Sequence, residues 1–242
     1  MNMQFSREAM LLGEDGLARL QHAHVAVFGV GGVGSFVAEA LARAGVGTIT
    51  LVDNDTVCES NLNRQLVALH STLGQYKTDV MAARIRDINP DCHVNCIRAY
   101  YEESNKEDFF SLHFDYIADA IDSVYSKLSL IVTALERGVP IISSMGTGNR
   151  LDPSKFVITD ISKTSGCPLA RVMRRELRNR GVRHHTVLAS TELPRKPLLP
   201  PQESGARQSV PGSVSWAPPC AGMLIAGYIL CSLALPPSTD TE

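Results

Sequence analysis

Short apolar runs alternate with segments of helical spacing through the first part of the chain. The apolar runs predict buried strands at residues 25–28, 48–52, 93–97, 114–120 and 139–144. Between them, apolar positions at helical spacing predict helices at residues 35–44, 77–88 and 124–137. Asn89-Pro90 and Gly138 are stop signals for the last two helices. This alternation predicts a mostly parallel sheet with right-handed crossovers.

The two ends of the chain are less regular. Residues 1–24 predict one or two helices ahead of the first strand. Beyond residue 150 the pattern predicts a strand at 156–161, an amphipathic helix at 167–180, a strand at 186–189 and an apolar helix at 221–235. Residues 191–212 are rich in proline and polar side chains, which predicts a mobile loop.

We therefore predict an α/β fold with a Rossmann-like, doubly wound, mostly parallel sheet and helices on both faces. Residues 1–242 form a single domain in this interpretation. Its core occupies 1–150, and an irregular C-terminal extension occupies 151–242.

Composition narrows the class of protein. The chain has 242 residues, 44% of them hydrophobic and 20% charged, which is ordinary for a soluble globular protein. The net charge is -2, so any contact with nucleic acid must come from a local basic patch. No C-x-x-C pair is present, which argues against a structural zinc ion, and the few cysteines favour a reducing, cytoplasmic location. The final apolar run is shorter than a typical membrane span, so we expect a buried or interface helix and leave peripheral membrane association open.

A glycine-rich turn joins the first strand to the first helix of the core. It reads G-V-G-G-V-G, with glycines at Gly29, Gly31, Gly32 and Gly34, and the next strand ends in Asp53. Glycines let the backbone approach a phosphate, the helix presents its free N–H groups, and the acid can accept hydrogen bonds from ribose. Nucleotide binding is the interpretation we favour, and a tight turn in a doubly wound sheet is the structural alternative.

Further polar residues fall where predicted parallel strands end or helices begin. They are Asp53, Asp55, Asn61, Arg64, Gln65, Lys77 and Asp122. Ligands of open parallel sheets bind beyond the carboxyl ends of the strands. Arg64 and Lys77 supply the cations, and Asp53 and Asp122 the acids, that nucleotidyl or phosphoryl transfer requires. Each of these side chains, taken alone, also fits a solvated loop position.

Four motifs together resemble those of the adenylating family of ubiquitin-activating enzymes and their bacterial relatives. They are G-V-G-G-V-G, D-N-D-T-V-C-E-S-N-L-N-R-Q, G-Q-Y-K and D-A-I-D, and the resemblance covers residues 5–150. It implies ATP and Mg²⁺ as cofactors, with Asp53 and Asp55 on the ATP side of the crevice and Asp53 on the ribose. It implies phosphate contacts from Asn61, Arg64, Gln65 and Lys77, and a magnesium-binding role for Asp122.

The N-terminal segment F-S-R-E also matches this family. The resemblance implies that Arg7 reaches the ATP phosphates, often from the partner subunit of a homodimer. From the residues alone, Arg7 fits a solvated charge beside an apolar face.

The second half resembles the branch of the family that cyclises threonylcarbamoyladenosine in tRNA. The resemblance rests on C-P-L-A-R-V-M-R-R-E-L-R-N-R-G-V, on G-S-V-S-W-A-P-P-C-A-G-M and on S-T-E-x-P at 190–194. It implies ATP-dependent dehydration of the modified base through an acyl-adenylate. The predicted helix at 167–180 adds a basic face that can neutralise tRNA phosphates, formed by Arg171, Arg174, Arg175 and Arg178.

Two other functions stay open at this point. The same ATP site can adenylate the C-terminus of a ubiquitin-like sulfur-carrier protein, and the fold can serve a non-catalytic NAD-binding or scaffold protein. Cys167 and Cys220 fit structural positions, and a persulfide or relay role is left open for Cys220. A structural monovalent cation, Na⁺ or K⁺, and a sulfur-transfer partner from a cysteine desulfurase system are likewise left open.

Overall fold

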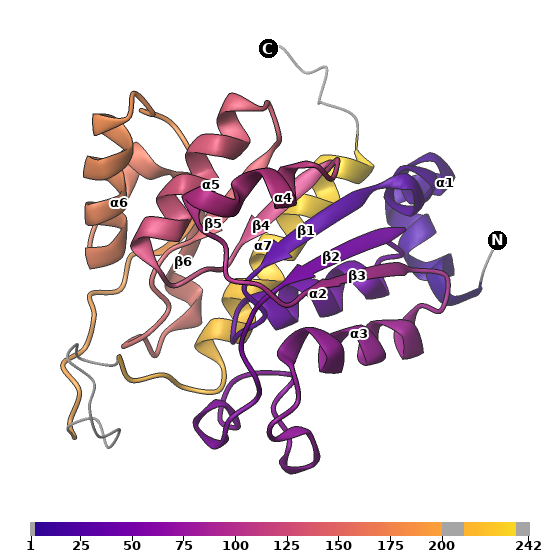
Figure 1. Ribbon diagram of the computed structural model, residues 1–242, viewed down its shortest axis with the longest axis horizontal. Coiled ribbons are helices and arrows are strands. Elements are labelled where there is room, and N and C mark those ends of the chain that lie inside the picture. Colours follow the sequence, from indigo (N-terminus) through magenta and orange to yellow (C-terminus); the bar gives the residue numbers. More distant parts are fainter. Residues whose placement is uncertain (1–2, 200–210, 236–242) are drawn as a thin grey trace.

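One seven-stranded sheet runs through the protein in the order β3-β2-β1-β4-β5-β7-β6 (Figure 1). The computed structural model describes residues 3–199 and 211–235. The strands are β1 (His24–Phe28), β2 (Thr48–Val52), β3 (His93–Ile97), β4 (Tyr116–Asp119), β5 (Ile141–Ser144), β6 (Phe156–Asp160) and β7 (Thr186–Ser190). All neighbouring pairs are parallel except β6 with β7. The predicted mostly parallel sheet is confirmed.

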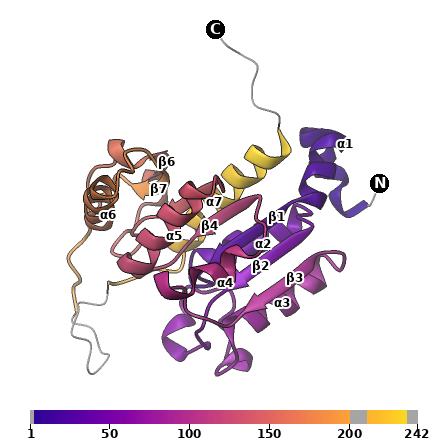
Figure 2. The same cartoon turned by 45° about the horizontal axis from the view of Figure 1, so that its top comes forward.

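Helices cover both faces of this sheet, as Figure 2 shows. The α-helices are α1 (Ser6–His22), α2 (Gly34–Arg43), α3 (Lys77–Ile88), α4 (Lys106–Phe110), α5 (Val124–Glu136), α6 (Pro168–Asn179) and α7 (Ala217–Ala234). Single 3-10 turns lie at η1 (Met3–Phe5), η2 (Glu59–Asn61), η3 (His70–Thr72), η4 (Glu103–Asn105), η5 (Pro153–Lys155) and η6 (Ile161–Lys163). Strand alternation sets the two cores: Val25 and Val27 face α2, α3 and α7, whereas Ala26 and Phe28 face α4, α5 and α6.

The extension after residue 150 completes the core domain. Its strands β6 and β7 join the same sheet, and α7 packs against α1 and α2. Helix α7 is long and apolar enough by composition to cross a membrane, but 44% of it is buried inside the protein. This burial agrees with the expectation of a buried or interface helix.

One helix has a kink within the predicted one or two helices, and another begins earlier than predicted. Helix α1 is broken by a kink at Gly13, where φ is 73°. Helix α7 begins at Ala217, before Pro218 and Pro219, because proline is tolerated in the first turn of a helix. In the predicted loop at 191–212, residues 191–199 and 211–212 form no helix or strand, and residues 200–210 lie outside the described part of the chain.

The turn after β1 is packed too closely for side chains. A Cβ atom on Gly34 would lie 1.8 Å from the carbonyl oxygen of Gly29, and Gly29 itself has a φ of 89°. The first turn of α2 therefore lies directly against the end of β1, which only glycine permits.

We expect Gly34→Ala to lower the free energy of unfolding by about 3 kcal/mol or more, because the backbone of the turn must move to admit the methyl group. Urea denaturation measures the change. The control is Gly74→Ala: Gly74 has a φ of 81° but no atom within 4 Å of the added Cβ. That variant carries only the left-handed backbone strain of roughly 1–2 kcal/mol. Equal costs for the two variants would contradict the packing argument.

Candidate functional site

Three strands end at one level and bring their following residues together. Phe28 of β1 is in register with Val52 of β2 and with Asp119 of β4. The glycine turn, Asp53 and the loop that carries Asp122 therefore share the carboxyl edge of the sheet. This is the edge at which open parallel sheets bind their ligands.

The glycine turn presents backbone donors to this edge. The N–H of Gly29 donates to the carbonyl of Val52, and the N–H of Val30 donates to Asp53. Within residues 3–199 and 211–235, the N–H groups of Gly31, Gly32 and Val33 donate to no hydrogen-bond acceptor. These donors precede α2, whose positive dipole end points the same way, so the turn is suited to a phosphate.

Asp53 holds the turn in place. Its Oδ2 accepts from the N–H of Val30 at 2.6 Å, and its Oδ1 accepts from the N–H of Asp55 at 2.8 Å. Burial raises the pKa of Asp53, and the Asp55 N–H and the charge of Lys77 oppose that rise. Each carboxylate oxygen keeps a second lone pair, so Asp53 can also accept hydrogen bonds from a ribose.

Lys77 reaches the same edge from the first position of α3. Its ammonium lies 2.7 Å from Oδ2 of Asp55, and its N–H donates to the Asp55 carbonyl. The lysine side chain is 6% exposed, whereas that of Asp55 is 60% exposed. The buried stem of Lys77 therefore fixes a positive charge at the rim of the site.

The turn at η2 places the remaining polar residues. Asn61 is buried and its Oδ1 accepts from the N–H of Cys58, which gives it a structural role in this turn. The Cγ of Arg64 lies 3.5 Å from an ideal Cβ on Gly32, and the Nε2 of Gln65 lies 3.7 Å from one on Gly31. Arg64 and Gln65 therefore lie against the glycine turn.

Gln65 and Arg64 differ in how they are held. The Oε1 of Gln65 is buried and has no hydrogen-bond partner among the described residues. Arg64 donates from Nη1 to the Ser60 carbonyl at 2.8 Å and to Oδ1 of Asn63 at 2.9 Å. Arg64 thus keeps its other guanidinium nitrogens for a ligand.

Asp122 stands exposed just after β4, above a buried ion pair that the sequence analysis missed. The ammonium of Lys127 lies 2.8 Å from Oδ2 of Asp119, and both side chains are 0% exposed. The Oδ1 of Asp119 accepts from the N–H of Ile121, so the pair fixes the start of the loop that carries Asp122. Lys127 lies among apolar positions of α5, but sequence offers no signal that its partner is Asp119.

A buried histidine lies near the same pair. The Nε2 of His185 lies 2.8 Å from Oγ of Ser143 on β5. Burial and the nearby charge of Lys127 lower the pKa of His185 to about 4. His185 is therefore neutral at neutral pH, and it adds no second positive charge beside Lys127.

Arg7 lies away from this cluster within its own chain. Its neighbour Phe5 packs against Gly45, before β2 begins, and Gln4 donates to the carbonyl of Ile88 at the end of α3. Both contacts lie at the amino edge of the sheet. In Figure 1, α1 is at the upper right and the loops of residues 53–76 are at the bottom.

The four predicted tRNA-binding arginines lie on α6, but they are not equivalent. Arg174 donates to the carbonyl and to Oγ1 of Thr164, each at 2.7 Å, and Arg175 pairs with Glu176. Arg171 and Arg178 are exposed and have no partner among the described residues.

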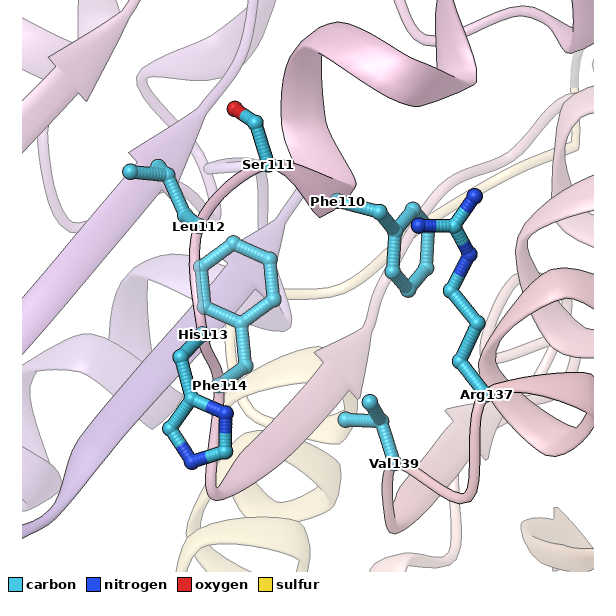
Figure 3. A pocket seen from close by; sticks show the side chains of 7 residues that line it. All are labelled: Phe110, Ser111, Leu112, His113, Phe114, Arg137 and Val139. Carbon is cyan, nitrogen blue, oxygen red and sulfur yellow. The ribbon is translucent and has the colours of Figure 1, made fainter.

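A pocket lies at the opposite edge of the sheet. Figure 3 shows this pocket of about 250 Å³, between the end of α4 and the amino ends of β4 and β5. Arg137 lines the pocket. Its guanidinium carbon lies 5.1 Å from the ring centre of Phe110, and the guanidinium pairs with Glu107. This pocket lies at the amino edge of the sheet and is therefore separate from the glycine turn at the carboxyl edge.

Known proteins match the chain along nearly its whole length. The model described as the ThiF family matches residues 5–236. The tRNA threonylcarbamoyladenosine dehydratase of Bacillus subtilis is 45% identical, over 95% of this chain and 94% of that protein. The Escherichia coli protein of the same name is 43% identical over 73% of this chain and 66% of its own length. The crystal structure of E. coli tRNA N6-threonylcarbamoyladenosine dehydratase, TcdA, in complex with ATP has a TM-score of 0.86 and 35% identity, over 95% and 93% of the two chains.

We expect Lys127→Met to lower the free energy of unfolding by about 3–5 kcal/mol, because it leaves the buried carboxylate of Asp119 unpaired. Urea denaturation of the purified variant measures the loss. The matched control is the double variant Asp119→Asn/Lys127→Met, which removes both charges and should recover a large part of the stability. A single variant as stable as the wild type would show that the pair does not hold this edge together.

Proposed function

The chain belongs to the ThiF family, and on that basis we propose that it catalyses the ATP-dependent dehydration of threonylcarbamoyladenosine in tRNA. One observation carries the proposal. The chain is 45% identical to a dehydratase of that name, over 95% of its own length and 94% of that protein. We place the reaction in the cytoplasm with its tRNA substrate.

ATP binds along the carboxyl edge of the sheet in this proposal. The free N–H groups of Gly31, Gly32 and Val33 receive its phosphates, and Asp53 accepts from its ribose hydroxyls. Arg64 and Lys77 flank the same turn with two positive charges. Cations placed in this way stabilise the charge that develops on the phosphate oxygens during transfer.

The charge pattern at Asp122 fits a magnesium ion that arrives with ATP. Magnesium is usually bound by one or two carboxylates together with phosphate oxygens and waters. Asp122 is exposed at the carboxyl edge and has no partner among the described residues. Its carboxylate can therefore serve as the single protein ligand of a phosphate-bound Mg²⁺.

The reaction proceeds in two steps. A carboxylate oxygen of the threonylcarbamoyl group attacks the α-phosphorus of ATP, the bond to the β-phosphate oxygen breaks, and pyrophosphate leaves. A nucleophile of the same modification then attacks the activated carbonyl carbon, loses its proton and closes a ring, while AMP leaves. No enzyme nucleophile is needed, and because the second attack is intramolecular, positioning supplies much of its rate.

The basic face of α6 is the surface that we assign to tRNA. Arg171 and Arg178 are exposed and available to phosphates. Arg175 is also exposed, but it forms an ion pair with Glu176. Arg174 is better placed to hold the start of α6 against Thr164. Contacts to phosphates from such a face supply affinity with little dependence on sequence.

The position of Arg7 fits a homodimer. Around Arg7, the outer side of η1 and α1 carries Met3, Met10 and Leu11, which are 88%, 83% and 85% exposed. An apolar face of this kind is typical of a surface that another protein covers, and a two-fold dimer covers it with a copy of itself. In such a dimer, Arg7 of one subunit reaches the ATP site of the other.

We expect Lys77→Met and Arg64→Met each to lower kcat/KM about 100-fold or more, because each removes a cation from the phosphate site. The assay incubates the protein with ATP and threonylcarbamoyladenosine-containing tRNA, and mass spectrometry detects loss of one water from the modified nucleoside. Lys106→Met, which removes an exposed pair with Glu103, is the control and should keep its activity. An unchanged nucleoside mass with the wild-type protein refutes the function itself. Pyrophosphate release that depends on a small Gly-Gly protein instead of tRNA would support the sulfur-carrier alternative.

Mixing two inactive variants tests whether Arg7 acts across subunits. Arg7→Ala and Lys77→Met should each be nearly inactive alone. Mixed in equal amounts and allowed to exchange subunits, they should regain about a quarter of wild-type activity, because about half of the dimers are mixed and each has one intact site. Water loss from tRNA again reports activity. No recovery, with dimers present by light scattering, would show that Arg7 does not act in trans.

A further inference from the structure

Arg150 is a buried guanidinium with almost no partners. Its side chain is 2% exposed and is the largest fully buried one in the described part of the chain. Its Nε and Nη1 have no hydrogen-bond partner among the described residues. Its Nη2 donates to the carbonyl of Gly166 at 3.4 Å, which is long for a hydrogen bond.

Burial of this group calls for a negative charge beside it. Arginine stays charged in proteins, and a buried charge is tolerated where it is paired and hydrogen-bonded. No carboxylate of the described residues pairs with Arg150. The site is therefore charged and desolvated before any ligand arrives, which is the condition of a preorganised anion site.

The start of α6 adds a second positive feature at the same place. Helix α6 has 12 residues, its N-cap Cys167 makes no side-chain cap, Pro168 has no N–H, and no acid lies in its first turn. The loop that carries Arg150 packs onto this helix end, since an ideal Cβ on Gly146 would lie 3.6 Å from Sγ of Cys167 and 3.8 Å from Cβ of Leu169. The unsatisfied donors of a helix N-terminus and a buried guanidinium thus lie together.

This pair of features lies on the same edge of the sheet as the glycine turn. The loop follows β5, whose neighbour β4 ends at Asp119, three residues before Asp122. The N–H of Met145, the first residue of the loop, donates to the carbonyl of Leu188 on β7. Arg150 is therefore on the side of the molecule where the acyl group must meet ATP.

We propose that Arg150 and the N-terminus of α6 bind the carboxylate of the threonylcarbamoyl group before its activation. The proposal rests on the proposed function and assigns the part of the substrate that this buried site receives. A carboxylate at the end of a short side chain can enter a buried site, whereas a backbone phosphate of tRNA carries a ribose on each side and needs an open surface. The planar guanidinium matches a planar carboxylate, and the long hydrogen bond to Gly166 is the contact that the ligand replaces.

The test compares wild type with Arg150→Met by thermal unfolding. Without ligand, Arg150→Met should melt about 2 °C or more above the wild type, because methionine fills the site without an unpaired charge. The free nucleoside N6-threonylcarbamoyladenosine should stabilise the wild type and Arg86→Met, which alters an exposed arginine of α3, but not Arg150→Met. Its methyl ester, which lacks the charge, should stabilise none of them.

Kinetics provide the second measurement. Arg150→Met should raise KM for the modified tRNA about tenfold or more and leave the Kd for ATP unchanged. Arg150→Lys, which keeps the positive charge, should raise KM less. A lower melting temperature together with an unchanged nucleoside shift would show that Arg150 is structural and would overturn the proposal. So would a shift produced equally by inorganic phosphate, or the absence of any nucleoside shift in the wild type. If the nucleoside binds through Arg150 but wild-type protein removes no water from tRNA, the proposed reaction fails while the carboxylate site stands.

Discussion

The candidate site depends on a few backbone N–H groups that donate to no acceptor among the described residues. They belong to Gly31, Gly32 and Val33, which directly precede α2. Unpaired donors are costly when buried, so they are kept at an edge that a ligand can reach. The register of β1 with β2 and β4 sets that edge, and close packing of Gly34 on Gly29 sets the angle of the helix. Asp53 then fixes the turn through Val30 and leaves its outer donors free.

The charged side chains at this edge of the sheet are of two kinds, which differ in how deeply they are buried. The side chain of Lys77 is 6% exposed and its partner Asp55 is 60% exposed, so this ion pair lies between the interior and the solvent. Lys127 and Asp119 neutralise each other out of contact with water and support the loop of Asp122 from below. Arg150 is buried like Lys127, but no carboxylate of the described residues pairs with it. Lys127 and Arg150 therefore differ in the groups that face them, which sequence position alone does not encode.

Much of the fold could be predicted because apolar periodicity is a local signal. The strand–helix alternation, the glycine turn and the residues just after each strand all depend on neighbours along the chain. The start of α7 was placed too late because a proline pair also fits inside a first helical turn. Arg174 and Thr164, Lys127 and Asp119, and Arg150 with the end of α6 are set by tertiary packing. Their charges look like ordinary surface charges until the sheet order is known.

Helix α7 joins the last part of the described chain to the first helices by packing against them. It packs against α1, α2 and the strands β4 to β7, and Gly222 lies so close to α2 that an added Cβ would be 2.5 Å from the Val33 carbonyl. At its other end, Arg19 of α1 donates to the carbonyl of Ala234 at 3.0 Å, so the first and last helices are joined. During synthesis, a chain that has not yet reached α7 leaves part of one face of its sheet open to water. The apolar surface under α7 is therefore covered only once that helix has been made, and until then it is the kind of exposed hydrophobic surface that makes a folding chain prone to aggregate.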